Sequence, residues 1–276
     1  MVRSLIFFLS LTFCLFSCEP EFAPPEDFQG LSDKKRKKLI QHYEGKRRAY
    51  YQGSRYKQES YELLQKLDPE NESYFRGQSV THSKIGDYHI AFPLLEQSKE
   101  LNPRENLYYY AWLLLDLYHD YERALAYLEE YDAFTPDQKD YAWGENVYQL
   151  KGKALKGLGR YSEAIKMFSQ AIETEGDYPD VYSFVYRGIC HAAEGNYSAA
   201  SSDFDVAIQQ YEQCSMAYFY KGKAAWEIKK DAKIARQNLN QARQLLLAGY
   251  KKTDPYKEVM DEIHIEMADD LLSLIH

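Results

Sequence analysis

Seven histidines and scattered carboxylates could do chemistry in this chain, as metal ligands or as general acids and bases. The histidines fit neither HExxH nor another ligand spacing: His42, His82, His89, His119, His191, His264 and His276. His264 and Glu266 are two residues apart, so on a helix they would point to different sides. The pair Asp269-Asp270 is typical of a solvated helix face. We therefore predict no catalytic residue, no metal and no cofactor.

The composition indicates a folded protein with an acidic surface. Of the 276 residues, 45% are hydrophobic, which is enough for a core, and 28% are charged. The formal net charge of −8 gives no general attraction to phosphates, so we expect no nucleic-acid partner. Tyrosine occurs 26 times. Its ring packs while its hydroxyl reaches a polar partner, which suits half-buried positions between helices.

Residues 1–17 have the features of a targeting signal. The apolar stretch over residues 5–16 has about the length of a signal-peptide core and is too short to span a bilayer. The segment LFSC, residues 15–18, resembles the lipobox of bacterial lipoproteins, although Phe16 stands where a small residue is usual. Looser lipoboxes of this kind are seen in Bacteroidetes-like sequences. The resemblance implies cleavage before Cys18 and lipid on that residue. The alternative is an ordinary secretory peptide with a coincidental cysteine.

The segment after Cys18 is predicted to be a flexible tether, residues 18–31, because it holds three prolines and no helical period. A basic run over residues 34–38 follows. It forms either the solvated first turn of a helix capped by Ser32, or a polybasic patch that binds anionic lipid beside the anchor.

Two further cysteines, Cys190 and Cys214, remain in the mature chain. Two thiols are a weak basis for a disulfide framework. We expect both to be free and to act as small apolar fillers of the core.

A repeated pattern decides the predicted fold. Residues 148–171 read YQLKGKALKGLGRYSEAIKMFSQA, and residues 184–207 read FVYRGICHAAEGNYSAASSDFDVA. Each has an aromatic four residues before a glycine (Gly152 or Gly188), then Gly-x-Tyr, an alanine, an aromatic and another alanine. This pattern resembles the tetratricopeptide repeat. The resemblance implies pairs of antiparallel helices that cross closely at the glycine.

Weaker copies extend the pattern in both directions. The tyrosines that follow the turns are 33, 40 and 36 residues apart, at Tyr88, Tyr121, Tyr161 and Tyr197. The family period is about 34, so the longer gap predicts an insertion around residues 137–141. We predict an all-α, right-handed solenoid of about six helix-turn-helix repeats over residues 32–276. Its last element would be a capping helix over residues 254–275, with an apolar residue every four positions.

In this family, the first helix (helix A) of each repeat lines a binding groove. The equivalent positions here supply amides, aromatics and lysines, which suit an extended peptide. The candidates are Arg76, Tyr109, Asn146, Gln149, Lys153, Lys156, Tyr182, Phe219, Lys223 and Trp226. Alternatively, Tyr182, Phe219 and Trp226 only pack under the capping helix. The clamp of chaperone-binding members is absent, because Tyr186 and Tyr220 stand where it would be completed.

The resemblances imply a non-enzymatic scaffold or adaptor that is tethered by lipid to the cell envelope, with the outer membrane favoured. Its partners would be other envelope proteins or peptides, and the membrane through the N-terminal lipid. The alternative from another class is a glycan- or nutrient-binding envelope lipoprotein that stacks sugars on an aromatic-rich groove.

Overall fold

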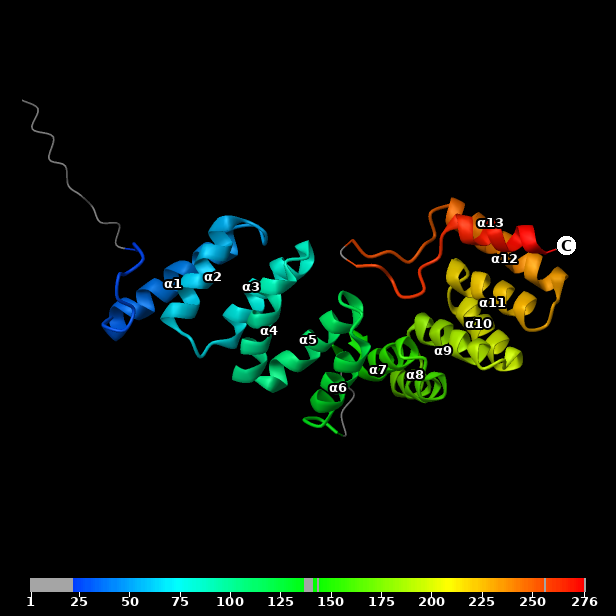
Figure 1. Cartoon of the computed structure of the whole chain (residues 1–276), viewed down its shortest axis with the longest axis horizontal. Coiled ribbons are helices and arrows are strands. Elements are labelled where there is room, and N and C mark those ends of the chain that lie inside the picture. The colour runs from blue at the N-terminus through cyan, green and yellow to red at the C-terminus, as the bar shows by residue number, and fades with distance from the viewer. Residues whose placement is uncertain (1–21, 137–140, 143, 256, 276) are drawn as a thin grey trace, which may run out of the picture. The chain divides into compact units, whose positions relative to one another are not determined.

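The computed structural model describes residues 22–136, 141–142, 144–255 and 257–275 (Figure 1). The predicted targeting signal and Cys18 lie outside these residues. The chain divides into two compact units, Met1–Glu70 and Asn71–His276. In the part of the chain that is described, no helix is both long and apolar enough to cross a membrane.

The first unit contains one helix pair, α1 (Asp33–Ala49) and α2 (Arg55–Leu67). The Ser32 side chain caps α1 by accepting a hydrogen bond from the backbone N–H of Lys35. The predicted helical start at Ser32 is thus present. Leu39 of α1 and Leu64 of α2 are almost fully buried, at 1% and 0% exposure.

Part of the predicted tether contacts this first pair. The Tyr43 hydroxyl donates a hydrogen bond to the carbonyl of Phe22 at 2.8 Å. The guanidinium of Arg36 donates to the carbonyl of Phe28 at 2.7 Å and to that of Leu67 at 2.6 Å. Phe22 and Phe28, which fall inside the predicted tether, are therefore held against the first helix pair.

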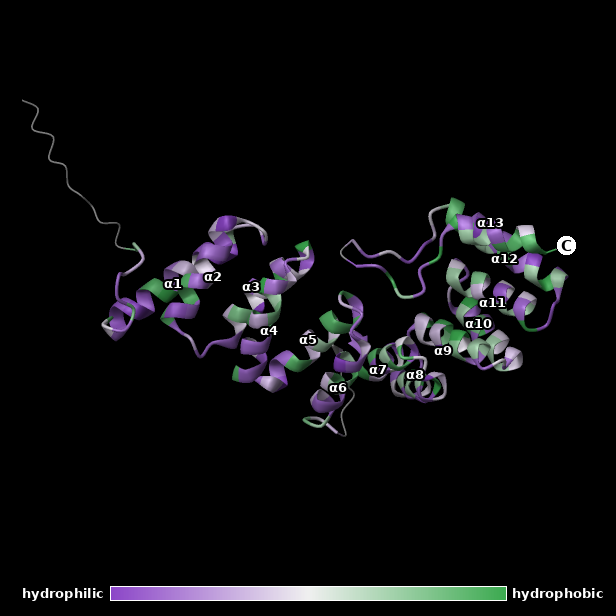
Figure 2. Cartoon of the chain, viewed as in Figure 1, coloured by the Kyte–Doolittle hydropathy of each residue, from purple (hydrophilic) through white to green (hydrophobic). Residues whose placement is uncertain are grey.

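The second unit contains five further helix pairs and a last short helix. The pairs are α3 (Glu72–Ile85) and α4 (Tyr88–Leu101), α5 (Pro103–Asp116) and α6 (Tyr121–Asp132), α7 (Val147–Gly157) and α8 (Tyr161–Glu175), α9 (Val181–Ala193) and α10 (Tyr197–Gln210), and α11 (Ser215–Glu227) and α12 (Ala232–Leu247). The last helix is α13 (Ile265–Leu274). Hydrophobic and hydrophilic residues alternate along these helices (Figure 2), as expected when each pair stacks on its neighbours. With α1 and α2, the described residues contain the six predicted pairs.

The repeat glycines lie where the two helices of a pair approach most closely. A Cβ atom built on Gly152 would lie 2.7 Å from the ring of Phe168, and one on Gly188 would lie 2.7 Å from the ring of Phe204. Real carbon atoms do not approach so closely, so any larger residue would push the helices apart. The close crossing predicted from the repeat pattern is confirmed at both glycines.

A short hairpin precedes α7, next to the predicted insertion. Strand β1 (Tyr141–Ala142) pairs antiparallel with β2 (Glu145–Asn146), and Ala142 is opposite Glu145. Gly144, at a φ of 86°, adopts the left-handed conformation that the tight turn requires. Residues 137–140 lie outside the described residues. The hairpin fixes the position of Glu145 just before α7.

The C-terminal helix is shorter than predicted. α13 begins at Ile265, whereas the apolar spacing predicts a helix from residue 254. A spacing of four residues is also an even number, so it fits one side of an extended segment as well as one face of a helix. Val259 and Ile263 are buried outside the helix. Asp261 has a left-handed φ of 57°, which ends any regular helix there.

Candidate functional site

Residues 250–255 and 257–264 lie in a long loop between α12 and α13, which we call the groove loop (Figure 1). It contacts side chains of helices α5, α7, α9 and α11, the A helices of four successive repeats. The ammonium of Lys251 lies 2.5 Å from the carboxylate of Glu262, so the outgoing and returning halves of the loop are joined at their base. We call the surface of these A helices under the loop the groove.

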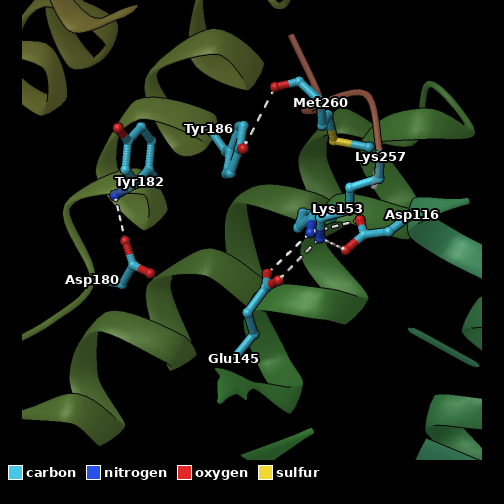
Figure 3. Close-up of polar contacts among 8 residues, drawn as sticks. All are labelled: Asp116, Glu145, Lys153, Asp180, Tyr182, Tyr186, Lys257 and Met260. Atoms are coloured by element: carbon cyan, nitrogen blue, oxygen red, sulfur yellow. Dashed lines mark hydrogen bonds and ion pairs between the residues drawn. The ribbon is translucent and has the colours of Figure 1, made fainter. Parts of the chain in front are cut away.

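The far end of the loop inserts a lysine between two carboxylates (Figure 3). Lys257 forms ion pairs with Asp116, at the end of α5, and with Glu145 of β2, the latter at 3.7 Å. Lys153 of α7 lies 2.8 Å from Asp116 and 3.0 Å from Glu145. Two lysines and two carboxylates thus alternate, and Lys257 also lies 4.9 Å from the ring centre of Trp112.

The charges of this cluster stabilise each other. Burial alone would raise the pKa of Asp116, but Lys153 and Lys257 lower it below its ordinary value. Burial alone would lower the pKa of Lys153, but Asp116 and Glu145 raise it above its ordinary value. Both groups are therefore charged at neutral pH. A buried charge that lost its partner would be strongly destabilising, so the cluster holds the loop end in one position.

A second set of contacts holds the returning half of the loop. The Lys156 ammonium on α7 lies 2.7 Å from the Asp261 carboxylate. The Tyr220 hydroxyl on α11 donates to the Asp261 carbonyl at 3.1 Å, and the Tyr186 hydroxyl on α9 donates to the Met260 carbonyl at 3.5 Å (Figure 3). Burial raises the pKa of both tyrosines, so each hydroxyl keeps the proton that it donates.

The outgoing half of the loop packs on aromatic rings. The Lys252 ammonium lies 3.5 Å from the ring centre of Tyr182 and 5.5 Å from that of Tyr186. Burial lowers the pKa of Lys252. Asp180 fixes the start of α9 by accepting a hydrogen bond from the backbone N–H of Tyr182 at 2.7 Å. The α9 tyrosines thus form a platform for the lysine stem and its charge.

Two cavities flank the loop in the groove. One of about 450 Å³ lies between the loop and the ends of α5 and α7, next to His119 and Tyr121. Another of about 300 Å³ lies between α9 and α11, next to Ile189 and Lys223. Both include Lys156 and Asp261 in their walls. The loop therefore fills the groove only in part.

The ten predicted groove residues fall into three groups. Lys153, Lys156 and Tyr182 hold the loop or its ion cluster, and Lys223 lines the second cavity. Four others are buried in the scaffold beneath: Tyr109, Asn146, Gln149 and Phe219. Two contact neighbouring elements, since Arg76 donates to the carbonyl of Glu105 and Trp226 lies under Lys230.

Equivalent groove positions differ in exposure. Lys153 and Lys223 each follow a repeat glycine by one residue. The Lys153 side chain is 5% exposed inside the ion cluster, whereas that of Lys223 is 40% exposed. Phe219, predicted either to line the groove or to pack under the capping helix, is 1% exposed and belongs to the hydrophobic core.

Sequence reasoning missed Glu145 and the loop residues Lys252, Lys257 and Asp261 as parts of the site. They lie outside the repeat pattern, and their partners are far away along the chain. The segment over residues 249–255 could have indicated a loop here, because it begins with Gly249, ends with Pro255 and contains two lysines and Thr253. Such a segment is a poor helix and favours a loop.

Comparisons with known proteins agree on the architecture. Residues 150–213 match the model of the tetratricopeptide repeat. The structure of YrrB, described as a repeat protein of this kind with an unusual peptide-binding site, superposes with a TM-score of 0.52 at 18% identity, covering 68% of this chain and 93% of YrrB. The chain has the tetratricopeptide-repeat fold. The groove is thus formed by the A helices of its third to sixth repeats.

Of two further comparisons, one covers a larger share of the chain than YrrB does and the other covers a smaller share. A tetratricopeptide-repeat protein of Cytophaga hutchinsonii superposes with a TM-score of 0.55 at 14% identity, covering 81% of this chain and 80% of that one. A mouse protein named N-alpha-acetyltransferase 16, NatA auxiliary subunit, is 29% identical over 129 residues, 43% of this chain. The matched part is only 14% of that relative. At these identities the structural similarities establish the fold alone.

Proposed function

We propose that this protein is a non-enzymatic scaffold that binds an extended segment of a partner protein in the groove of its tetratricopeptide repeats. One observation carries the proposal: the groove already holds an irregular peptide segment, residues 250–264, through side chains of four successive A helices. Repeat solenoids expose long, continuous surfaces that suit such segments. The peptide-binding site named for YrrB, a protein of the same fold, agrees with this use.

We further infer that lipid on Cys18 tethers the scaffold to the cell envelope, with the outer membrane favoured, and that its partners are other envelope proteins. The support for this inference is the sequence of residues 1–18 and its resemblance to a lipoprotein signal. The described residues begin after this segment.

The groove favours a peptide over a sugar. Sugars stack on open aromatic faces, but Tyr109 and Phe219 are buried, at 3% and 1% exposure. The ring of Tyr182 is covered by Lys252. The groups that do face the loop are ammonium, carboxylate and hydroxyl groups, which pair with peptide side chains and carbonyls.

Site-specific photo-crosslinking in native membranes tests the proposal. A photoreactive amino acid replaces Lys223, which lines the second cavity, and in a control replaces Tyr178, which is 92% exposed between α8 and α9. The proposal predicts a protein adduct at position 223 that is absent or much weaker at position 178. Equal adducts at both positions, or none at position 223, would contradict a groove-bound partner.

A further inference from the structure

The contacts of the groove loop contain a recognition pattern. Lys257 enters the cluster of Asp116 and Glu145, and four residues later Asp261 pairs with Lys156. Val259, which lies between them in the sequence, is buried, at 6% exposure. The pattern is therefore Lys-x-apolar-x-Asp, with a basic and an acidic group at a fixed separation.

Side chains of the repeats also form hydrogen bonds with the main chain of the loop. The carbonyls of Met260 and Asp261 accept hydrogen bonds from Tyr186 and Tyr220. Backbone acceptors are common to every peptide, so they give affinity, while the two charged side chains give direction and register. The left-handed φ of 57° at Asp261 turns the carboxylate and carbonyl of one residue toward two different helices.

The loop is held in a manner that allows its replacement. The backbone of the loop forms local hydrogen bonds, such as the one from the N–H of Glu262 to the carbonyl of Val259 at 2.9 Å. The contacts across the groove that are named above each involve a side chain of the repeats, and cavities of about 450 and 300 Å³ lie beside the loop. The helix pairs stack through their own interfaces, so a segment of this kind can open without unfolding the repeats.

We propose that the groove recognises a partner segment that carries a lysine and, four residues further on, an aspartate, and that the groove loop holds the same contacts until this segment displaces it. This proposal rests on the proposed function and names its ligand class. A tethered loop competes at an effective concentration in the millimolar range, so it weakens the apparent affinity for any segment in solution. The loop therefore favours partner segments that are presented at high local concentration, because these compete with it effectively.

The test uses a fluorescein-labelled peptide with the sequence of residues 250–264 and measures its anisotropy with the full chain. Three chains are compared: wild type, the double variant Lys257→Ala with Asp261→Asn, and the control Glu258→Gln. Asparagine keeps the size of Asp261 and tolerates its left-handed backbone. Glu258 is an exposed residue of the same loop. We expect the double variant to bind the peptide at least about tenfold more tightly than wild type and the control.

Specificity is measured with a second labelled peptide that carries Lys257→Ala and Asp261→Asn. We expect the double variant to bind this peptide at least about tenfold more weakly than the wild-type peptide, since each charged contact is lost. Equal affinity of wild type and the double variant for the first peptide overturns the proposal. Equal affinity of the double variant for the two peptides also overturns it.

A measurement on the wild-type chain covers the case in which the double variant does not fold. Excess unlabelled peptide should increase hydrogen exchange in residues 257–263 of the loop and leave exchange in α8 unchanged. No increase at millimolar peptide overturns the proposal. If photo-crosslinking at position 223 still yields a protein adduct in that case, the scaffold function stands and only the ligand class is wrong.

Discussion

The ammonium of Lys156 on α7 lies 2.7 Å from the carboxylate of Asp261, although 105 residues separate them in the sequence. This contact joins the groove loop, which follows the last repeat, to α7 of the fourth repeat. Both side chains are largely buried, at 10% and 19% exposure, so solvent screens their attraction less than at a surface pair. The groove loop is therefore held in the groove by specific contacts.

Acid should release the contribution of the ion cluster. The folded-state pKa of Asp116 lies below its ordinary value of about 4, so its stabilisation is complete above about pH 4 and is lost as pH falls through the folded-state pKa. Denaturant unfolding of wild type and Asp116→Asn measures this. The stability difference should be constant from pH 7 to about pH 5 and shrink below about pH 4. A difference unchanged down to pH 2.5 would show that Asp116 is not paired in the folded state.

Replacing Gly188 should destabilise the repeat stack. A Cβ atom there would lie 2.7 Å from the ring of Phe204, so Gly188→Ala should lower the free energy of unfolding by about 1–3 kcal/mol. The matched control is Gly45→Ala in α1, where nothing lies within 4 Å and alanine is the better helix former. The control should be neutral or stabilising by up to about 1 kcal/mol. Thermal unfolding measures both; equal losses would argue against the close crossing.

Both cysteines of the second unit should be free but unreactive in the folded chain. Cys190 and Cys214 are unbridged and buried, at 0% and 1% exposure. Burial raises the pKa of Cys190 to about 12, so little thiolate forms at neutral pH. Iodoacetamide followed by mass spectrometry should label neither residue natively and both after denaturation without reductant. Persistent protection after denaturation would instead indicate a disulfide.

The lipid anchor is tested at Cys18. If the cysteine is lipidated, the wild-type protein should fractionate with membranes and incorporate labelled palmitate. Cys18→Ala should lose the label and be released or remain unprocessed. The matched control is Ser17→Ala, which keeps a small residue before the cysteine and should behave as wild type. Equal palmitate in wild type and Cys18→Ala would rule out this anchor.

The repeat framework could be predicted from sequence because its signals are local. The contacts of Gly152 with Phe168 and of Gly188 with Phe204 recur at one spacing in every strong copy, 16 residues apart. A helix crossing dictates the residue type there, so the pattern gives the pairs and their register. The longer gap before Tyr161 likewise gave the region of the insertion, next to which the hairpin of β1 and β2 lies.

The groove loop could not be predicted in the same way. Val259 and Ile263 repeat every four residues, and this spacing fits a helix face and one side of an extended segment equally well. The partners of Lys257 and Asp261 are 141 and 105 residues away, so no local pattern connects them. Lys153 was predicted to line the groove, but its burial depends on these distant residues and was missed.

Zero-length crosslinking tests the central claim, that the groove loop occupies the groove, most directly. A carbodiimide joins an ammonium and a carboxylate only when they are in contact. Treatment of the folded wild-type monomer, digestion and mass spectrometry should identify a link between Lys156 and Asp261, which lie 2.7 Å apart. The internal control is the link between Lys151 and Asp132, which are 2.6 Å apart in the repeat stack. If both links form, the loop is in the groove. If the control link forms and the link of Lys156 to Asp261 does not, the account is wrong.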